Sequence, residues 1–417
     1  MAQLSDDCFA LGGTLLTVAE AIAEIEARVT PVVETETVAL HAAVGRVLAR
    51  DIVATMNLPP HANSAVDGYA VAHADLLPDC ETVLPVTGRA AAGHPLDRVA
   101  RRGEAIRIFT GAPMPDGTDT VMMQEDCSVE GEWVRLKCGI KKGANRRHAG
   151  EDVALGEVAL RAGHRLRAPD LGLAAALGLR ELVAFRPLRV ALLSTGDEIR
   201  DPGEPLPPGS IYDANRFMLG ALLAEVGCAV TDFGIRPDRE AALVDALADA
   251  STGHDLIVTS GGVSTGEEDH VKSAVERLGT LHFWRLAIKP GRPVALGQVR
   301  GVPFVGLPGN PVAVIVTFIV LTRPLIAKLA GSTPPPPRLF PVRTGFSYRK
   351  KPGRREYLRA SLDRDGDAVV AIKYPRDGAG ILSSIVRSDG LVIFDEAASS
   401  LAIGTMVDFL PFSEVIG

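Results

Sequence analysis

Apolar and polar positions follow two different periods along residues 188–329. Continuous apolar runs predict buried strands, and runs with an apolar residue every three or four positions predict helices. The predicted strands cover residues 188–194, 229–233, 256–258, 281–286 and 302–307, and the predicted helices cover residues 215–226, 239–250, 269–278 and 311–329. Such alternation is typical of a doubly wound α/β sheet, whose ligand site lies at the carboxyl ends of its strands.

The chain on either side of this region has a different pattern. Val18, Ile22 and Ile25 share one face with glutamates opposite, which predicts an amphipathic helix over residues 18–28. Residues 63–138 hold short β-like runs separated by glycine-containing turns, as in a small β-barrel or sandwich. Short β-runs also follow a stiff proline spacer at residues 334–337 and predict a second small β-domain.

These changes of pattern predict four parts. A chain of 417 residues is too long for one ordinary core. We expect an elongated N-terminal domain made of residues 14–55 and 144–182, an inserted β-domain of residues 56–143, an α/β domain of residues 183–331 and a C-terminal β-domain of residues 338–417.

The composition is that of a globular protein and argues against some partners. Hydrophobic residues make up 47% and charged residues 23% of the chain, and the net charge is −7. This acidic balance disfavours nucleic acid and anionic membranes as partners, so any anion must be bound locally. The longest strongly apolar run, residues 312–321, is shorter than the ~18 residues of a membrane span and predicts a buried helix.

The cysteines and the start of the chain bear on localisation. The five cysteines are Cys8, Cys80, Cys127, Cys138 and Cys228. Their odd number and wide spacing favour a reduced cytosol over a disulfide framework or a zinc site. The first ten residues carry two aspartates and no basic segment, so no signal peptide is visible. We therefore expect a cytoplasmic protein.

A loop of small residues follows the predicted strand 256–258. It contains Ser260, Gly261, Gly262 and Ser264, and the predicted helix begins at Asp269. A strand that passes through glycines into a helix leaves free N–H groups and a positive helix dipole at one place, which suits a phosphate. A tight turn capped by Asp269 is the alternative. The loop matches neither G-x-G-x-x-G nor a Walker A sequence.

A second glycine-bearing loop, S-T-G-D-E, carries Asp197 and Glu198 after the strand 188–194. Paired carboxylates beside a phosphate loop are ligands for Mg²⁺, which retains several waters. A solvated turn with an acid at a helix N-terminus is the alternative. Two such loops at one edge of one sheet favour the magnesium interpretation.

Cations gather after the predicted strand 281–286. Arg285, Lys289 and Arg292 lie in or beside the loop A-I-K-P-G-R-P, which its prolines make stiff. Fixed cations in the cleft of an acidic protein would bind an oxyanion and a phosphate, whereas solvated basic residues in a turn are the alternative. The next loop, G-L-P-G-N-P, carries Pro308 and Pro311 and predicts a rigid strand-to-helix junction.

Three motifs in the first half of the chain are better explained as turns or linkers than as catalytic sites. Asp67-Gly68 predicts a hairpin turn, and Thr110 begins a second turn. The segment R-R-H-A-G-E-D, which ends at Asp152, predicts a charged and solvated linker. None of the three indicates a substrate by itself.

Taken together and in order, these segments closely resemble the molybdopterin molybdenumtransferase family, the MoeA proteins, to which the E domain of gephyrin also belongs. The matching motifs are S-A-V-D-G-Y-A, T-G-A-x-x-P, G-E-D-V, S-T-G-D-E, Y-D-A-N-R, S-G-G-V-S-T-G-E-E-D, W-R-L-A-I-K-P-G-R-P and G-L-P-G-N-P-V. They cover nearly the whole chain, and eight ordered motifs are far more specific than any one of them.

The resemblance implies a fold, an assembly and a reaction. The subunit would combine the elongated and inserted parts with a molybdopterin-binding, MoaB/Mog-like α/β domain and a C-terminal β-barrel. It would form an elongated homodimer. The implied reaction inserts molybdenum from molybdate into adenylylated molybdopterin, releases AMP and requires Mg²⁺. The residues alone support a phosphate, a divalent ion and an oxyanion, and only the resemblance supplies the pterin and the molybdenum.

The family's functional positions carry over residue by residue. The implied catalytic residues are Asp67, Thr110, Asp152, Glu198, Asp238 and Asp269, and the implied Mg²⁺ ligands are Asp197, Glu198 and Asp269. The implied residues that bind the pterin, phosphates and molybdate are Ser260, Gly261, Gly262, Ser264, Arg285, Lys289, Arg292, Pro308 and Pro311. Asp67 and Thr110 would come from the partner subunit.

This sequence departs from the family at Arg285 and Arg292, where lysine is common. A planar guanidinium then replaces a point charge, which leaves the geometry of the oxyanion contact open. Molybdopterin adenylyltransferase and molybdoenzyme acceptors are expected protein partners. The alternative functions are the adenylyltransferase itself, whose dedicated enzymes are small single-domain proteins, and a non-enzymatic scaffold like the gephyrin E domain.

Overall fold

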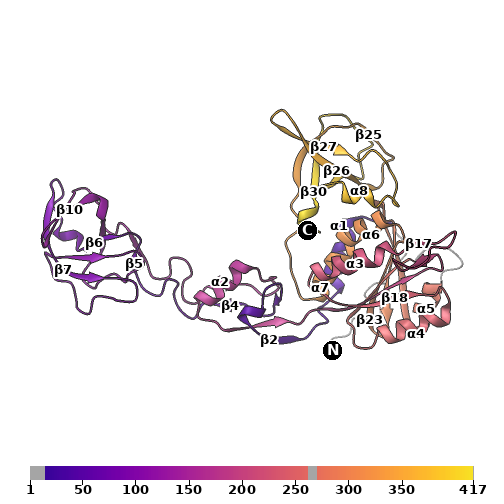
Figure 1. The fold of residues 1–417 in the computed structure, drawn as a ribbon, viewed down its shortest axis with the longest axis horizontal. Coiled ribbons are helices and arrows are strands. Elements are labelled where there is room, and N and C mark those ends of the chain that lie inside the picture. Colours follow the sequence, from indigo (N-terminus) through magenta and orange to yellow (C-terminus); the bar gives the residue numbers. More distant parts are fainter. Residues whose placement is uncertain (1–14, 262–269, 417) are drawn as a thin grey trace.

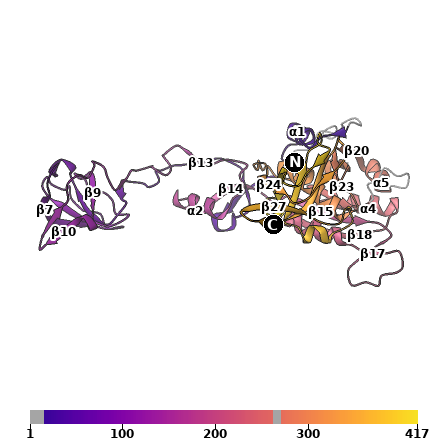
Figure 2. The same ribbon diagram turned by 90° about the horizontal axis from the view of Figure 1, so that it is seen from above.

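A computed structural model describes residues 15–261 and 270–416 of the chain. The molecule is elongated, with a compact body at one end and a small β-sheet unit at the other (Figures 1 and 2). A narrow middle part joins the two, and the chain passes along it once outward and once back (Figure 1).

The body is built on a mixed sheet with the strand order β1-β20-β22-β23-β19-β15-β18. The strands are β1 (Leu15–Leu16), β20 (Gly279–Leu286), β22 (Pro293–Val299), β23 (Val302–Leu307), β19 (Leu256–Ser260), β15 (Arg189–Thr195) and β18 (Ala229–Arg236). The four from β23 to β18 are parallel, whereas β22 runs antiparallel to both of its neighbours. The sequence pattern did not predict β22. A two-residue turn at Arg300 and Gly301, both with positive φ, joins it to β23.

Helices cover both faces of this sheet. The helices α1 (Val18–Arg28), α3 (Ala214–Glu225), α6 (Pro311–Thr317), π-helical η4 (Phe318–Thr322) and α7 (Arg323–Leu329) cover one face, and α4 (Glu240–Ala250) and α5 (His270–Leu278) cover the other. Alternation along β15 explains the division, because Val190 and Leu192 pack into the first core and Ala191 and Leu193 into the second. The predicted doubly wound α/β architecture is confirmed.

The segment Pro311–Leu329 is long and apolar enough to cross a membrane by composition, the one such helix among the described residues. In the structure, 78% of its most apolar window is buried inside the protein. It is therefore the buried core helix that the sequence predicted.

The middle part consists of short paired strands. They are β2 (Thr35–Ala39) and β3 (Val47–Leu48) on either side of β14 (Glu181–Phe185), β4 (Ile52–Val53) with β13 (Val158–Leu160), and β5 (Asn63–Ser64) with β12 (Arg146–Arg147), accompanied by η1 (Leu40–Ala42) and α2 (Ala168–Ala176). Each of these pairs is antiparallel. Residues 144–185 therefore run back along residues 35–64.

The far unit contains a sheet with the order β10-β11-β7-β8-β6-β9. Its elements are β6 (Gly68–Val71), β7 (Thr82–Ala90), β8 (Ala105–Ile108), β9 (Thr120–Met123), β10 (Cys127–Glu130), β11 (Trp133–Leu136), η2 (His73–Asp75) and η3 (Gln124–Asp126). The hairpin turn predicted at Asp67-Gly68 is wrong, because β6 lies between β8 and β9 and does not pair with β5. A Cβ on Gly68 would lie 1.8 Å from the Met122 carbonyl oxygen, so this glycine serves a close strand approach.

The last part is a closed barrel in the order β26-β27-β24-β30-β28, with β28 returning to β26. Its elements are β24 (Phe340–Thr344), β25 (Tyr348–Arg349), β26 (Arg355–Asp365), β27 (Ala368–Lys373), α8 (Ser383–Val386), β28 (Gly390–Phe394), β29 (Ser400–Leu401), β30 (Met406–Pro411) and η5 (Phe412–Glu414). The implied C-terminal barrel is confirmed. A short strand of the α/β domain, β21 (Ile288–Lys289), adds to the barrel along β26.

Candidate functional site

The loops predicted to carry the site lie at one edge of the α/β sheet. In the parallel register Ser260 of β19 is paired with Ser194 of β15 and with Leu307 of β23. Thr195 is paired with Arg236 at the end of β18. The chain leaves all four strands at this level, so the loops that follow them are neighbours. This is the edge at which doubly wound sheets bind ligands.

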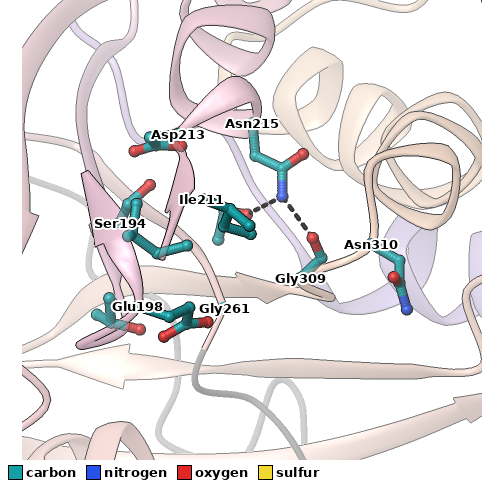
Figure 3. A pocket seen from close by; sticks show the side chains of 11 residues that line it. Ser194, Glu198, Ile211, Asp213, Asn215, Gly261, Gly309 and Asn310 are labelled. Atoms are coloured by element: carbon teal, nitrogen blue, oxygen red, sulfur yellow. Dashed lines mark hydrogen bonds between the residues drawn. The ribbon is translucent and has the colours of Figure 1, made fainter. Parts of the chain in front are cut away.

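A cavity of about 300 Å³ opens between these loops (Figure 3). It is lined by Ser194, Thr195, Glu198, Ile199, Ile211, Asp213, Asn215, Ser260, Gly261, Gly309 and Asn310. Ile199 and Ile211 belong to β16 (Ile199–Arg200) and β17 (Ile211–Tyr212), a small parallel pair of strands. The remaining lining is mostly polar.

Several polar atoms of the lining have no partner in the described part of the chain. The Ser194 Oγ, Thr195 Oγ1 and Asn215 Oδ1 atoms are buried and make no hydrogen bond there. Buried polar atoms are normally satisfied, so three unsatisfied ones around one cavity indicate a ligand or neighbouring loop that completes them. The chemistry of this lining suits a polar, hydrogen-bonding ligand.

Gly261 is required by its surroundings. Its φ is +88°, and a Cβ at this position would lie 2.7 Å from the Thr195 carbonyl oxygen. The backbone therefore crosses directly over the end of β15, which a side chain would prevent. Gly262, Ser264 and Asp269, the other predicted residues of this loop, lie outside the described residues.

Asn215 ties three loops together at the cavity. Its Nδ2 donates to Ser260 Oγ at 2.9 Å and to the Gly309 carbonyl oxygen at 2.7 Å (Figure 3). It lies in the first turn of α3, where Asp213 caps the helix by accepting from the Arg216 N–H. Asn215 was not predicted as a site residue, although it lies in the motif Y-D-A-N-R. No feature of the local pattern pointed to its two long-range partners.

The predicted acids form one end of the site. The Asp238 N–H donates to Asp197 Oδ1 at 3.2 Å, which brings the loop after β18 to the loop after β15. Burial raises the pKa of Asp238, and the nearby carboxylates of Asp197 and Glu198 act in the same direction, whereas His270 opposes them. The structure thus brings Asp197, Glu198 and Asp238 together.

The acidic end offers Mg²⁺ few protein ligands. Among the described residues, no three Asp, Glu, His or Cys side chains are close enough to hold a metal ion. Asp269, the third predicted ligand, lies outside them. Mg²⁺ is commonly held by one or two carboxylates together with waters and substrate phosphates, and Asp197 and Glu198 are of that type. The acidic end therefore fits a Mg²⁺ ion that is bound by protein carboxylates and substrate phosphates together.

The predicted cations form the opposite end. Arg285 is the last but one residue of β20, and Arg292 directly precedes β22, so both lie at the same edge of the sheet. Their side chains make no hydrogen bond or ion pair with the described residues. Lys289 differs, because it lies in strand β21 and not in the predicted loop, and its Nζ lies 3.2 Å from both carboxylate oxygens of Glu356 in the barrel.

The two ends are well separated. Four strand steps lie between β15, which precedes the acids, and β20, which carries Arg285. At the usual spacing between neighbouring strands this is roughly 19 Å. A compact anion is too small to touch both ends, so a ligand that uses the whole edge must be extended.

Pro308 and Pro311 shape the loop between the ends. Pro311 occupies the first turn of α6, as predicted, and the Val314 N–H donates to the Asn310 carbonyl oxygen. Pro308 is half-buried beside Gly309 and Asn310, which line the cavity. The role in shape expected for both prolines stays a prediction.

The remaining predicted residues lie far from this edge in the same chain. Asp67 Oδ1 accepts hydrogen bonds from Thr110 N–H at 2.8 Å and Thr110 Oγ1 at 2.7 Å, which lower the pKa of Asp67. The pair lies in the far β-unit, at the opposite end of the molecule from α4 and α5 (Figure 1). Asp152 is exposed in the middle part, where its N–H donates to the Leu58 carbonyl oxygen.

Comparison with known proteins assigns the chain to a family. Residues 16–178 match the MoeA N-terminal region (domains I and II), residues 191–328 match a probable molybdopterin binding domain, and residues 341–412 match the MoeA C-terminal region (domain IV). A molybdopterin molybdenumtransferase of Haemophilus influenzae is 38% identical over 92% of this chain and 95% of its own length. The chain belongs to the molybdopterin molybdenumtransferase family.

Other members of the family agree with this assignment. Molybdopterin molybdenumtransferase 2 of Mycobacterium tuberculosis is 37% identical over 89% of this chain and 93% of its own length. A crystal structure of a MoeA protein from Pyrococcus horikoshii superposes with a TM-score of 0.81 at 28% identity, covering 95% of this chain and 100% of that one. Within the family division, both ends of the site fall in the molybdopterin binding region and Asp67 and Thr110 fall in the N-terminal region.

Proposed function

We propose that this chain is a molybdopterin molybdenumtransferase, a transferase that inserts molybdenum from molybdate into molybdopterin during biosynthesis of the molybdenum cofactor. The observation that carries the proposal is one sheet edge with carboxylates at one end, cations at the other and a polar cavity between them, within the region that matches a molybdopterin binding domain. The relatives named for this activity cover nearly the whole chain. The enzyme works in the cytoplasm.

The substrate we propose is adenylylated molybdopterin. The roughly 19 Å between the ends suits an extended molecule in which a pyrophosphate joins the pterin to a nucleoside. Ser260, Gly261 and Asn215 would hold the phosphates in the cavity, together with Gly262 and Ser264. Arg285, Lys289 and Arg292 would hold molybdate at the basic end, where guanidinium groups donate two parallel hydrogen bonds to an oxyanion.

The acidic end would bind Mg²⁺ and supply a proton at the phosphates. Asp197 and Glu198, with Asp269, would hold Mg²⁺, whose charge offsets the negative charge of the phosphates when AMP leaves. Asp238, whose pKa is raised by burial, would retain a proton to a higher pH than an exposed aspartate does. It is the candidate proton donor beside the leaving phosphate.

We further propose that the active site is completed by a second copy of the chain. Asp67 and Thr110 lie at the opposite end of the molecule from the cavity, too far to act there within one subunit. In an elongated homodimer, the far β-unit of one copy would reach the α/β edge of the other. Mixing Asp67→Asn with Glu198→Gln, each strongly impaired alone, would then raise activity through mixed dimers that contain one intact site. No recovery in mixtures that have exchanged subunits would overturn this arrangement.

A direct assay tests the function. Purified protein supplied with adenylylated molybdopterin, molybdate and Mg²⁺ should release AMP and yield cofactor that reconstitutes a molybdoenzyme. Absence of molybdate-dependent AMP release would overturn the proposal. ATP-dependent adenylylation of molybdopterin without molybdate would identify an adenylyltransferase, and stable capture of a peptide partner without turnover would identify a scaffold.

A further inference from the structure

The α/β domain and the barrel meet at the basic end of the site. Strand β21 pairs in parallel with the beginning of β26, with Ile288 opposite Arg355 and Lys289 opposite Glu356. The Arg355 N–H also donates to the Ala287 carbonyl oxygen at 2.7 Å. Barrel backbone therefore runs directly beside the segment that presents Lys289.

The carboxylate of Glu356 is buried at this junction. The residue is 4% exposed, and both of its oxygens lie 3.2 Å from Lys289 Nζ. The Tyr348 hydroxyl donates to Glu356 Oε2 at 2.8 Å. A buried carboxylate is costly unless it is paired and hydrogen-bonded, so the lysine and the tyrosine together account for its presence.

Tyr348 is itself held in place. Its ring meets Phe394 edge to face at 6.0 Å between centroids, and Lys373 Nζ lies 5.7 Å from the ring centre. Burial and the hydrogen bond to Glu356 raise the pKa of Tyr348, so the hydroxyl keeps the proton that it donates. Glu356 is thus fixed from the barrel side independently of Lys289.

The three cations of the basic end therefore differ in how firmly their side chains are held. Arg285 and Arg292 are exposed and make no ion pair with the described residues, so they adapt to whatever binds. The side chain of Lys289 is half exposed, yet its ammonium group is anchored on a buried carboxylate from another domain. Its position is set before any ligand arrives.

We propose that Glu356 is a positioning residue for molybdate binding, which acts by holding the Lys289 ammonium where it contacts the oxyanion. The proposal rests on the proposed function, and it makes the barrel a contributor to the basic end. A preset cation loses less side-chain entropy when the ligand binds.

Removing the charge of Glu356 separates two explanations. If only net charge mattered, Glu356→Gln would make the basic end more positive and would strengthen binding of molybdate. If Glu356 positions Lys289, the same substitution releases the lysine into solvent and weakens binding. We expect the second result, with the KM for molybdate rising about tenfold and kcat changing little.

Control variants isolate the Lys289 contact. Glu396→Gln removes another barrel carboxylate, which accepts from Arg355 Nε at 3.2 Å and does not contact Lys289, and it should leave the KM for molybdate unchanged. Tyr348→Phe removes only the hydroxyl and should raise KM by a smaller factor than Glu356→Gln. In a Lys289→Met background, Glu356→Gln should add nothing, because the positioned group is already gone. Independent, multiplicative effects would overturn the proposal.

A readout that needs no turnover tests the anchor itself. Acetic anhydride labelling, followed by peptide mass spectrometry, measures the reactivity of the Lys289 amine in the intact protein. Lys289 should react several-fold faster in Glu356→Gln than in the parent protein or in Glu396→Gln, with unchanged circular dichroism. Equal labelling rates would overturn the proposal. If the parent protein showed no molybdate-dependent activity, the proposed function would fail while this labelling still decided whether Glu356 holds Lys289.

Discussion

The acidic end and the basic end of the same sheet edge are built from different kinds of contact. Asp197, Glu198 and Asp238 all come from loops that follow parallel strands of one domain. At the basic end, Lys289 is anchored through Glu356 of the barrel. The acidic end therefore depends on the α/β fold alone, whereas the basic end also depends on how two domains meet. Variants that affect one end and spare the other test this difference.

The largest effect is expected at the acidic end. Glu198→Gln removes one of the proposed Mg²⁺ ligands, and we expect molybdate-dependent AMP release to fall roughly 100-fold with the fold intact. Rising Mg²⁺ should recover part of the loss. Glu204→Gln, an exposed acid in the following turn, is the matched control and should behave like the parent protein. Equal activity of both variants would remove the metal assignment.

The next largest effect is expected at the basic end. Arg292→Ala should raise the KM for molybdate roughly 30-fold, because a charge-assisted hydrogen bond to the oxyanion is lost. Arg292→Lys should retain most of the affinity, since it keeps the charge. AMP release at saturating molybdate measures kcat separately. A change in kcat with constant KM would place Arg292 outside the oxyanion contact.

A smaller effect is expected at Gly261, where the backbone passes closely over the end of β15. Gly253 and Gly261 both have positive φ, but only at Gly261 would a Cβ meet neighbouring atoms. Gly253→Ala should cost about 1 kcal/mol of unfolding free energy through backbone strain alone. Gly261→Ala should cost about 1–3 kcal/mol more, because β15 must move. Urea unfolding followed by the fluorescence of Trp284, in a Trp133→Phe background, compares the two, and equal costs would contradict the close approach.

The smallest effect is a pH dependence of stability at the acidic end. Because the pKa of Asp238 is raised in the folded protein, its ionisation opposes folding as pH rises through that pKa. Below the ordinary aspartate pKa of about 3.9, the carboxyl is protonated in both states and the effect disappears. Asp238→Asn should therefore melt about 1–3 °C above the parent protein at pH 7. Calorimetry should show the gap closing toward pH 4, whereas Asp245→Asn, at an exposed position of α4, should show no gap.

Much of the fold was predictable because its signals are local. The helix Val18–Arg28 and the strand Val302–Leu307 were predicted to the residue, since the period of their apolar positions marks them. The Asp67-Gly68 turn failed for the opposite reason. A glycine that permits a tight turn is indistinguishable in sequence from a glycine that permits close strand approach, and only the position of Met122 decided between them.

The residues of the candidate site also fall into those that local sequence predicts and those that it does not. Glycines, acids and cations after predicted strands were visible in the sequence, because the carboxyl ends of parallel strands are a predictable place for ligands. Asn215 and Glu356 were not visible, since their partners lie 45, 94 and 67 residues away. The resemblance supplied Asp67 and Thr110, which no pattern in this chain connects to the cavity.

The sequence by itself determined which chemistry each loop carries, because loop chemistry depends on residues that are neighbours along the chain. Only the tertiary structure decided that the acids and the cations lie at opposite ends of one edge, with a polar cavity between them. Strand order in the sheet places β23 and β22 between β19 and β20, although β20 follows β19 along the chain. β20, β22 and β23 stay neighbours in the sheet as they are along the chain, so the long-range pairing of β23 with β19 is what places the cations away from the acids.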